Sequence, residues 1–76
     1  MVFASGFIEV EDIDMLSEVE NEVRDRSVEV SGIHQDRILF LIERENSTDT
    51  KRALESLKVI KGVRNVYLAY FSLEEQ

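Results

Sequence analysis

Helical and strand-like hydrophobic patterns alternate along this chain and predict its secondary structure. Apolar residues recur at helical spacing over residues 54–60, Gly62 ends that pattern, and residues 63–71 read as a strand. A similar succession occurs earlier, where an apolar run over residues 2–10 precedes a helical pattern over residues 13–23 and a strand around Val28 and Val30. The chain therefore reads as a strand–helix–strand (βαβ) pattern that occurs twice.

Two more strands are predicted between the helical segments. Val28 and Val30 alternate with polar residues, as expected of a half-buried edge strand, and Gly32 to Arg37 are predicted to form a hairpin loop. Residues 38–42 are apolar without alternation, which predicts a strand that is covered on both faces or meets a partner on one face. Gly6 predicts a bulge or a close backbone approach within the first strand.

Polar residues predict where the two helices begin. Asp12 is placed to cap the first helix, and Ser47 or Thr48 to cap the second. The first helix is expected to end near residues 24–26, where arginines suit its negative end. Its apolar face is predicted to consist of Ile13, Leu16, Val19 and Val23.

The order of these elements predicts a ferredoxin-like α+β fold, a split βαβ of the form βαββαβ. Right-handed crossovers give a four-stranded antiparallel sheet of order 4-1-3-2, with both helices on one face. The first and third strands, which are the most continuously apolar, are the two that this topology makes central. Residues 1–76 are expected to form a single domain, because a chain of 76 residues is long enough for only one. A domain this small buries only about 60% of its unfolded surface, so modest stability is expected.

Composition and charge narrow the class of protein. The chain has no cysteine, the N-terminus lacks the basic flank of a secretory signal, and no apolar run approaches the roughly 20 residues that span a bilayer. We therefore expect a soluble protein that is not inserted in a membrane, with the whole chain as its mature form. Residues 1–36 carry ten acids and two bases, a net charge of −8, whereas residues 37–76 carry six acids and seven bases, a net charge of +1. The acidic balance predicts no nucleic-acid partner and favours a basic peptide.

The sheet face opposite the helices is the candidate functional surface, because helices on one side leave the other side uncovered. If Ile8 and Val10 point toward the helices, the alternate residues of the first strand point away, and the same argument applies to the last strand. Either Leu39 with Leu41 or a second pair, Ile38 with Phe40, must join them. The predicted peptide-binding residues are Phe3, Phe7, Glu9, Glu29, Tyr67 and Phe71. A homodimer that buries two such faces against each other is the alternative.

The sequence offers little for catalysis, and we predict no catalytic residue, no metal site and no cofactor. His34 is the sole histidine and is expected in the hairpin loop beside Asp36, where one imidazole and one carboxylate do not complete a metal site. The three glycines are too far apart for a phosphate-binding loop. The chain is thus not expected to be an enzyme. A regulatory or dimerisation domain of the ACT or Lrp-effector type, with a ligand site near Gly32 and Asp36, remains the alternative function.

The chain resembles the NapD family of small cytoplasmic chaperones of periplasmic nitrate reductase. The resemblance is strongest over residues 57–70, which look like that family's helix, glycine–valine turn and closing strand ending in tyrosine. Residues 28–30 and 38–43 also resemble its middle hairpin. Lys61 stands where the family usually has proline, and Phe71 where a histidine commonly follows the tyrosine.

This resemblance implies a cytoplasmic chaperone that binds the twin-arginine signal peptide of an exported molybdenum enzyme during its maturation. The precursor would be held back from export until its cofactor is installed. From strand parity, we expect Phe7, Tyr67 and Phe71 to receive apolar residues of the peptide, and Glu9 and Glu29 to meet its arginines.

Overall fold

The computed structural model describes residues 1–73 and has the predicted order of elements. These are β1 (Val2–Val10), η1 (Ile13–Met15), α1 (Leu16–Asp25), β2 (Glu29–His34), β3 (Arg37–Arg44), α2 (Ser47–Lys58) and β4 (Val63–Leu73). The four strands form one antiparallel sheet in the order β2-β3-β1-β4, which confirms the predicted order and the ferredoxin-like fold. Within these residues, no helix is long and apolar enough to cross a membrane.

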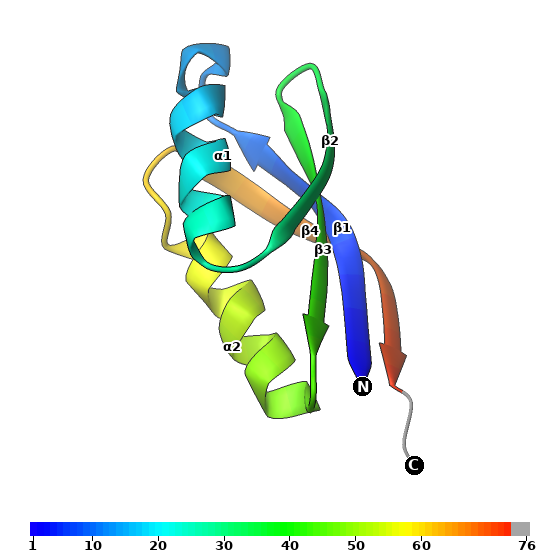
Figure 1. The fold of residues 1–76 in the computed structure, drawn as a ribbon. Helices are drawn as coiled ribbons and strands as arrows, with labels where there is room; N and C mark the ends of the chain where they lie inside the picture. The colour runs from blue at the N-terminus through cyan, green and yellow to red at the C-terminus, as the bar shows by residue number, and fades with distance from the viewer. Residues whose placement is uncertain (74–76) are drawn as a thin grey trace.

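Both helices lie on the same side of the sheet (Figure 1), and the hydrophobic core lies between the helices and the sheet. Alternate residues of β1 are buried, starting at Val2, and the residues between them are half-buried. Strand β3 shows the same alternation, so the predicted case in which both of its faces are covered is wrong. The other predicted case, in which one face meets a partner, stays a prediction. The central buried side chains are Ala4, Ile8, Val10, Val19, Val23, Ile38, Phe40, Ile42 and Leu57.

The helix starts agree with the sequence in one case and differ in the other. The Asp12 carboxylate accepts the N–H of Asp14 at 2.9 Å, so Asp12 caps the 3-10 turn η1, where the predicted first helix was to begin, and α1 itself starts at Leu16. The second helix is capped by Asn46, whose Oδ1 accepts the N–H of Asp49 at 2.8 Å. The prediction of Ser47 or Thr48 is therefore wrong, because both residues already lie within the helix.

The first turn before α1 is a 3-10 turn, and this changes one predicted core residue. Val19 and Val23 are buried as expected, but Ile13 is 62% exposed. Three residues per turn rotate the side chains differently from an α-helix, so an apolar residue in phase with the helix falls out of phase in the turn. Leu16 packs against the core as predicted, and Met15 packs there in place of Ile13.

The end of α1 is a Schellman motif with serine at the left-handed position. Ser27 has φ 60, its N–H bonds to the Arg24 carbonyl at 3.0 Å, and the Val28 N–H bonds to the Val23 carbonyl at 3.4 Å. The guanidinium of Arg44, at the end of β3, donates to the carbonyls of Arg26 and Ser27 at 3.2 and 3.3 Å. This side chain ties the end of the helix to the sheet.

The hairpin between β2 and β3 is tighter than the sequence predicts. Strand β2 continues to His34, which pairs with Arg37, so Gln35 and Asp36 alone form the turn. Gln35 adopts a left-handed φ of 58 there. His34 is accordingly a strand residue and does not lie in a loop. A register shift after Val30 gives β2 a bulge, and Gly32, which follows the bulge, was predicted to begin the hairpin loop.

Candidate functional site

The sheet surface opposite the helices is not covered by any described part of the chain. Residues directly opposite each other on neighbouring antiparallel strands share a face, so the register assigns each side chain to one side. We call this surface the open face. Its residues are Phe3, Ser5, Phe7, Glu9, Glu29, Gly32, His34, Arg37, Leu39, Leu41, Glu43, Asn65, Tyr67, Tyr70 and Ser72.

An aromatic pair occupies the middle of the open face. Phe7 of β1 pairs with Tyr67 of β4, and their rings are stacked with centroids 4.7 Å apart and an interplanar angle of 27°. On the other side of Phe7, the guanidinium carbon of Arg37 lies 4.9 Å from the ring centroid. Strand β1 runs between β3 and β4, so Arg37 and Tyr67 approach Phe7 from opposite sides. The three side chains form a row across the central strands.

Aliphatic and aromatic neighbours extend this row into an apolar surface. Leu39 lies opposite Phe7 on β3, and Leu41 lies opposite Ser5. Leu39 is 39% exposed, Tyr67 43% and Tyr70 58%. Exposed apolar side chains that adjoin one another are typical of a surface that binds another molecule.

Carboxylates stand around the apolar surface. Glu9 lies opposite Arg37 and accepts a hydrogen bond from Asn65 Nδ2 at 3.4 Å. Glu29 lies opposite Leu41, and Glu43 opposite Phe3. Within residues 1–73, the ion pairs join Arg24 to Glu20, Arg26 to Glu22 and Lys58 to Glu55, all in or beside the helices. The three open-face carboxylates are therefore free of ion pairs with this part of the chain.

The register places five of the six predicted residues on the open face: Phe3, Phe7, Glu9, Glu29 and Tyr67. The sixth, Phe71, lies opposite Ala4, which is fully buried on the helix side, so its predicted orientation is wrong. Whether these residues bind a peptide stays a prediction.

A bulge in β4 explains why Phe71 does not lie on the open face. Gly6 pairs with Leu68 and Ser5 pairs with Tyr70, so Ala69 has no partner in β1. One extra residue reverses the faces of everything beyond it, which brings Tyr70 to the open face and turns Phe71 away. Alternation along a regular strand could not identify Tyr70 as an open-face residue. Gly6 could have done so, because it predicted an irregularity at this point of the sheet.

Three further residues of the open face, Leu39, Leu41 and Arg37, were either left open or placed elsewhere by the sequence analysis. The sequence left open which pair of β3 would face outward, and the structure selects Leu39 with Leu41 because Ile38 and Phe40 are buried. Arg37 was placed in a loop, but it is the first residue of β3, and its guanidinium lies over Phe7.

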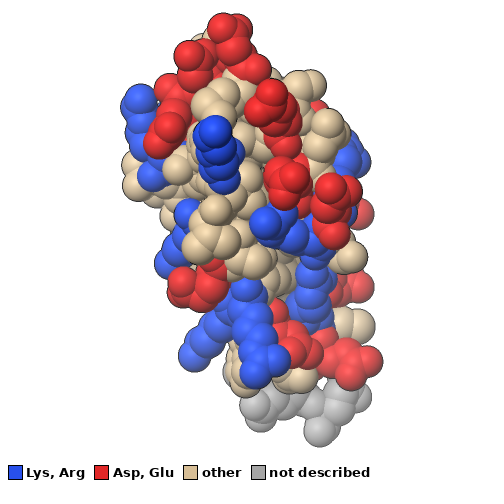
Figure 2. Space-filling model, turned by 90° about the vertical axis from the view of Figure 1, so that its left-hand side faces the viewer, with Lys and Arg blue, Asp and Glu red and all other residues tan. Residues whose placement is uncertain are grey.

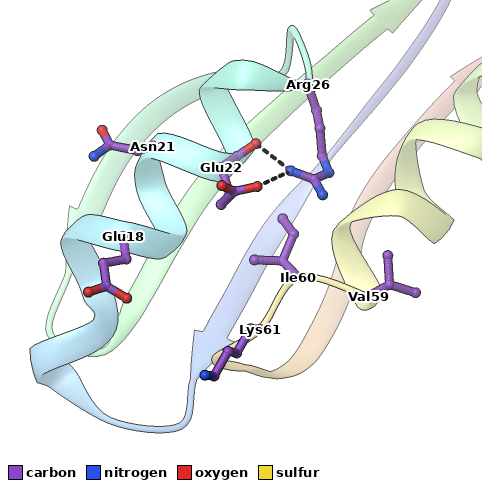
Figure 3. Close-up of a pocket in the computed structure, with 7 residues that line it drawn as sticks. All are labelled: Glu18, Asn21, Glu22, Arg26, Val59, Ile60 and Lys61. Carbon is purple, nitrogen blue, oxygen red and sulfur yellow. Dashed lines mark hydrogen bonds and ion pairs between the residues drawn. The ribbon is translucent and has the colours of Figure 1, made fainter.

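The helix side has a different character. Figure 2, which looks onto the helices, shows acidic side chains gathered at the top and basic and acidic side chains mixed below them. A shallow hollow of about 600 Å³ lies between α1 and the segment that links α2 to β4 (Figure 3). Arg26 reaches along this hollow and is held by the carboxylate and the carbonyl of Glu22, at 2.8 and 2.9 Å. Within residues 1–73, no group of three or more His, Asp or Glu side chains could hold a metal ion.

Comparison with known proteins gives one match in structure. No model of a protein family matches the chain, and no curated protein matches it either. The fold is similar to the solution structure of the E. coli Tat proofreading chaperone protein NapD, with a TM-score of 0.82 and 22% sequence identity, over 97% of this chain and 80% of that one. At this identity the match establishes the fold, and the fold expected from the NapD resemblance is confirmed.

Proposed function

We propose that this protein is a cytoplasmic chaperone whose open face binds the twin-arginine signal peptide of an exported molybdenum enzyme, nitrate reductase-like, during its maturation. The proposal requires no catalytic step, cofactor or metal, and no contact with nucleic acid. Its partner is a peptide that combines a short apolar segment with two adjacent arginines. Both of these features have a counterpart on the open face.

The stacked Phe7–Tyr67 pair, with carboxylates around it, is the observation that carries this proposal. Rings at the centre of a surface provide the large apolar contact area that dominates binding energy in most interfaces. Glu9, Glu29 and Glu43 stand at different margins of the apolar surface and form no ion pair within residues 1–73. A guanidinium matches a carboxylate in geometry and charge, so these three carboxylates are suited to bind the arginines of a peptide.

The fold likeness to NapD supports the same reading. That protein is described as a Tat proofreading chaperone, and this chain shares its fold over 97% of the present sequence. The net charge of −7 also favours a cationic ligand, because opposite net charges accelerate diffusional encounter. The aromatic and acidic residues of the open face then select the ligand at short range.

Calorimetric titration of the full chain with twin-arginine leader peptides tests the proposal. The leaders come from exported molybdenum enzymes of the same organism, and a matched control peptide has lysine in place of both arginines. We expect micromolar or tighter binding that weakens with salt and on loss of the arginines. Absence of binding to every leader would contradict the proposal.

A second copy of the chain is the competing occupant of the open face. Exposed Leu39, Tyr67 and Tyr70 would suit a homodimer interface as well as a peptide site. A regulatory dimer of the ACT or Lrp-effector type would be dimeric at all concentrations and would not bind leaders. Sedimentation measurements on the same sample distinguish this alternative, since a leader-binding face must be accessible.

A further inference from the structure

We propose that Arg37 occupies, in the free protein, the position over Phe7 that an arginine of the bound peptide takes in the complex. Arg37 would then be a built-in competitor, and it would set how strong an arginine contact a peptide must make before it binds. This inference rests on the proposed function and adds a specificity-determining residue to the same site.

Two side chains of this protein, Tyr67 and Arg37, already contact the ring of Phe7. Tyr67 stacks on one side of Phe7 with centroids 4.7 Å apart, and Arg37 lies over the ring from the β3 side with its guanidinium carbon at 4.9 Å from the centroid. Both approaches to the ring are thereby used by this chain. A guanidinium from a ligand can reach Phe7 only if Arg37 leaves.

The contact between Arg37 and Phe7 is not imposed by the register of the strands. Arg37 lies directly opposite Glu9 on β1, whereas Leu39 lies directly opposite Phe7. Arg37 therefore reaches diagonally to the ring, and within residues 1–73 it forms no ion pair with Glu9. Cross-strand diagonal neighbours are within reach of long side chains, so both positions are accessible to the guanidinium.

Glu9 gives the displaced side chain a place to go. Within residues 1–73, the Glu9 carboxylate is held by one long hydrogen bond of 3.4 Å from Asn65 Nδ2. When a ligand arginine takes the face of Phe7, Arg37 can turn to this carboxylate across the strand pair. The exchange replaces one guanidinium–ring contact by another, so the competition costs the ligand affinity without blocking it.

Removing the competitor is expected to strengthen binding. An exposed cation–π contact is weak. If Arg37 no longer competes for the ring, the twin-arginine leader should bind Arg37→Gln about two- to fivefold more tightly than it binds the wild type. Arg37→Lys should give a smaller gain, since an ammonium stacks less well than a guanidinium. The twin-lysine peptide, which does not depend on the ring face in the same way, should gain little.

Arg52→Gln is the matched control for charge. Arg52 is exposed on α2, on the helix side, and its removal changes the net charge by the same amount. We expect no gain in affinity from this variant. Equal gains from Arg52→Gln and Arg37→Gln would mean that the effect is general electrostatics, and the inference would be wrong.

A double-mutant cycle with Phe7→Leu separates competition on the ring from local charge repulsion. If Arg37 acts through the ring, the gain from Arg37→Gln disappears in the Phe7→Leu background. If the gain persists there, Arg37 acts by repulsion and the proposal fails. Thermal unfolding of each variant shows that the fold is retained.

The results also distinguish this inference from the function on which it rests. Binding of the leader to the wild-type chain, with equal or weaker binding to Arg37→Gln, overturns the role of Arg37 and leaves the proposed function intact. Absence of binding to both the wild type and Arg37→Gln overturns the proposed function, and the role of Arg37 falls with it.

Discussion

The backbone carbonyl of Tyr67 lies against Gly6, at the place where a Cβ on Gly6 would stand. This close approach occurs beside the bulge of β4, where Gly6 pairs with Leu68 and Ala69 is left without a partner. A missing side chain on β1 thus makes room for the irregular strand beside it. The bulge in turn decides which residues of β4 reach the open face, so a residue without a side chain shapes the candidate site.

Substituting Gly6 by alanine should destabilise the fold strongly. The added methyl group collides with backbone, which cannot move away as a flexible side chain can, so we expect a loss of about 3 kcal/mol in the free energy of unfolding. Urea denaturation measures it. Gly32→Ala is the control, because a Cβ there meets only the half-exposed Leu39 side chain at 3.4 Å. Similar losses in both variants would refute the role given to Gly6.

The fold could be predicted from the sequence because its signals were long and consistent. The apolar run of residues 2–10 is β1 with the same bounds, and the helix, glycine and strand that follow residue 47 are α2, Gly62 and β4. Helix α2 ends at Lys58, before the predicted stop at Gly62, and Gly62 adopts φ 99, a conformation that few other residues adopt, in the turn before β4. Where periodicity extends over several turns, local propensity and tertiary packing agree.

The site was less predictable because single-residue irregularities decide it. Parity from Val66 along a regular strand puts Phe71 outward, but the unpaired Ala69 shifts the register by one. The place of Arg37 on the open face was missed for a related reason. Gly32, Ile33 and His34 were predicted to lie in a loop, although they continue β2. A pattern of alternation cannot locate an extra residue, since the bulge depends on contacts between strands that are distant in the sequence.

Tyr70 and Phe71 provide a direct test of the bulge in solution. Tyr70 lies on the open face and Phe71 on the helix side, so Tyr70→Ala should weaken binding of the twin-arginine leader by about 1 kcal/mol, whereas Phe71→Ala should not. Titration calorimetry on both variants measures this. The opposite result, with Phe71 important and Tyr70 neutral, would show that β4 runs without the bulge.

The cap of α2 offers a second test of what the sequence missed. Asn46 accepts the N–H of Asp49 at 2.8 Å, so Asn46→Ala should cost about 1 kcal/mol of stability. Ser47→Ala is the matched control, since Ser47 is already inside the helix and its substitution should change stability little. Chemical denaturation compares them. A larger loss for Ser47→Ala would restore the capping residue predicted from the sequence.

Ser27 holds a left-handed conformation at the end of α1, with φ 60, and glycine should be better there. A side chain in this conformation costs about 1–2 kcal/mol, which glycine avoids. Glycine also has a larger entropy in the unfolded state, and this reduces the net stabilisation. We expect Ser27→Gly to stabilise the fold by about 0.5–1 kcal/mol in urea denaturation. Ser31→Gly, in β2, should destabilise the fold, because a glycine in a strand loses more conformational entropy on folding and there is no backbone strain to relieve. Stabilisation by both substitutions would point to a cause other than backbone strain.

The stacked pair at the centre of the open face should act as one binding unit. Phe7→Ala and Tyr67→Ala should each weaken leader binding by about 1 to 3 kcal/mol while the fold is retained, because both rings lie on the sheet surface and outside the buried core. Each ring supports the other, so the double variant should lose less than the two single losses together. Calorimetry on the three variants measures this coupling, and Leu68→Ala, on the helix side of β4, is the control that should bind normally. Unchanged affinity in both single variants would remove the open face as the peptide site.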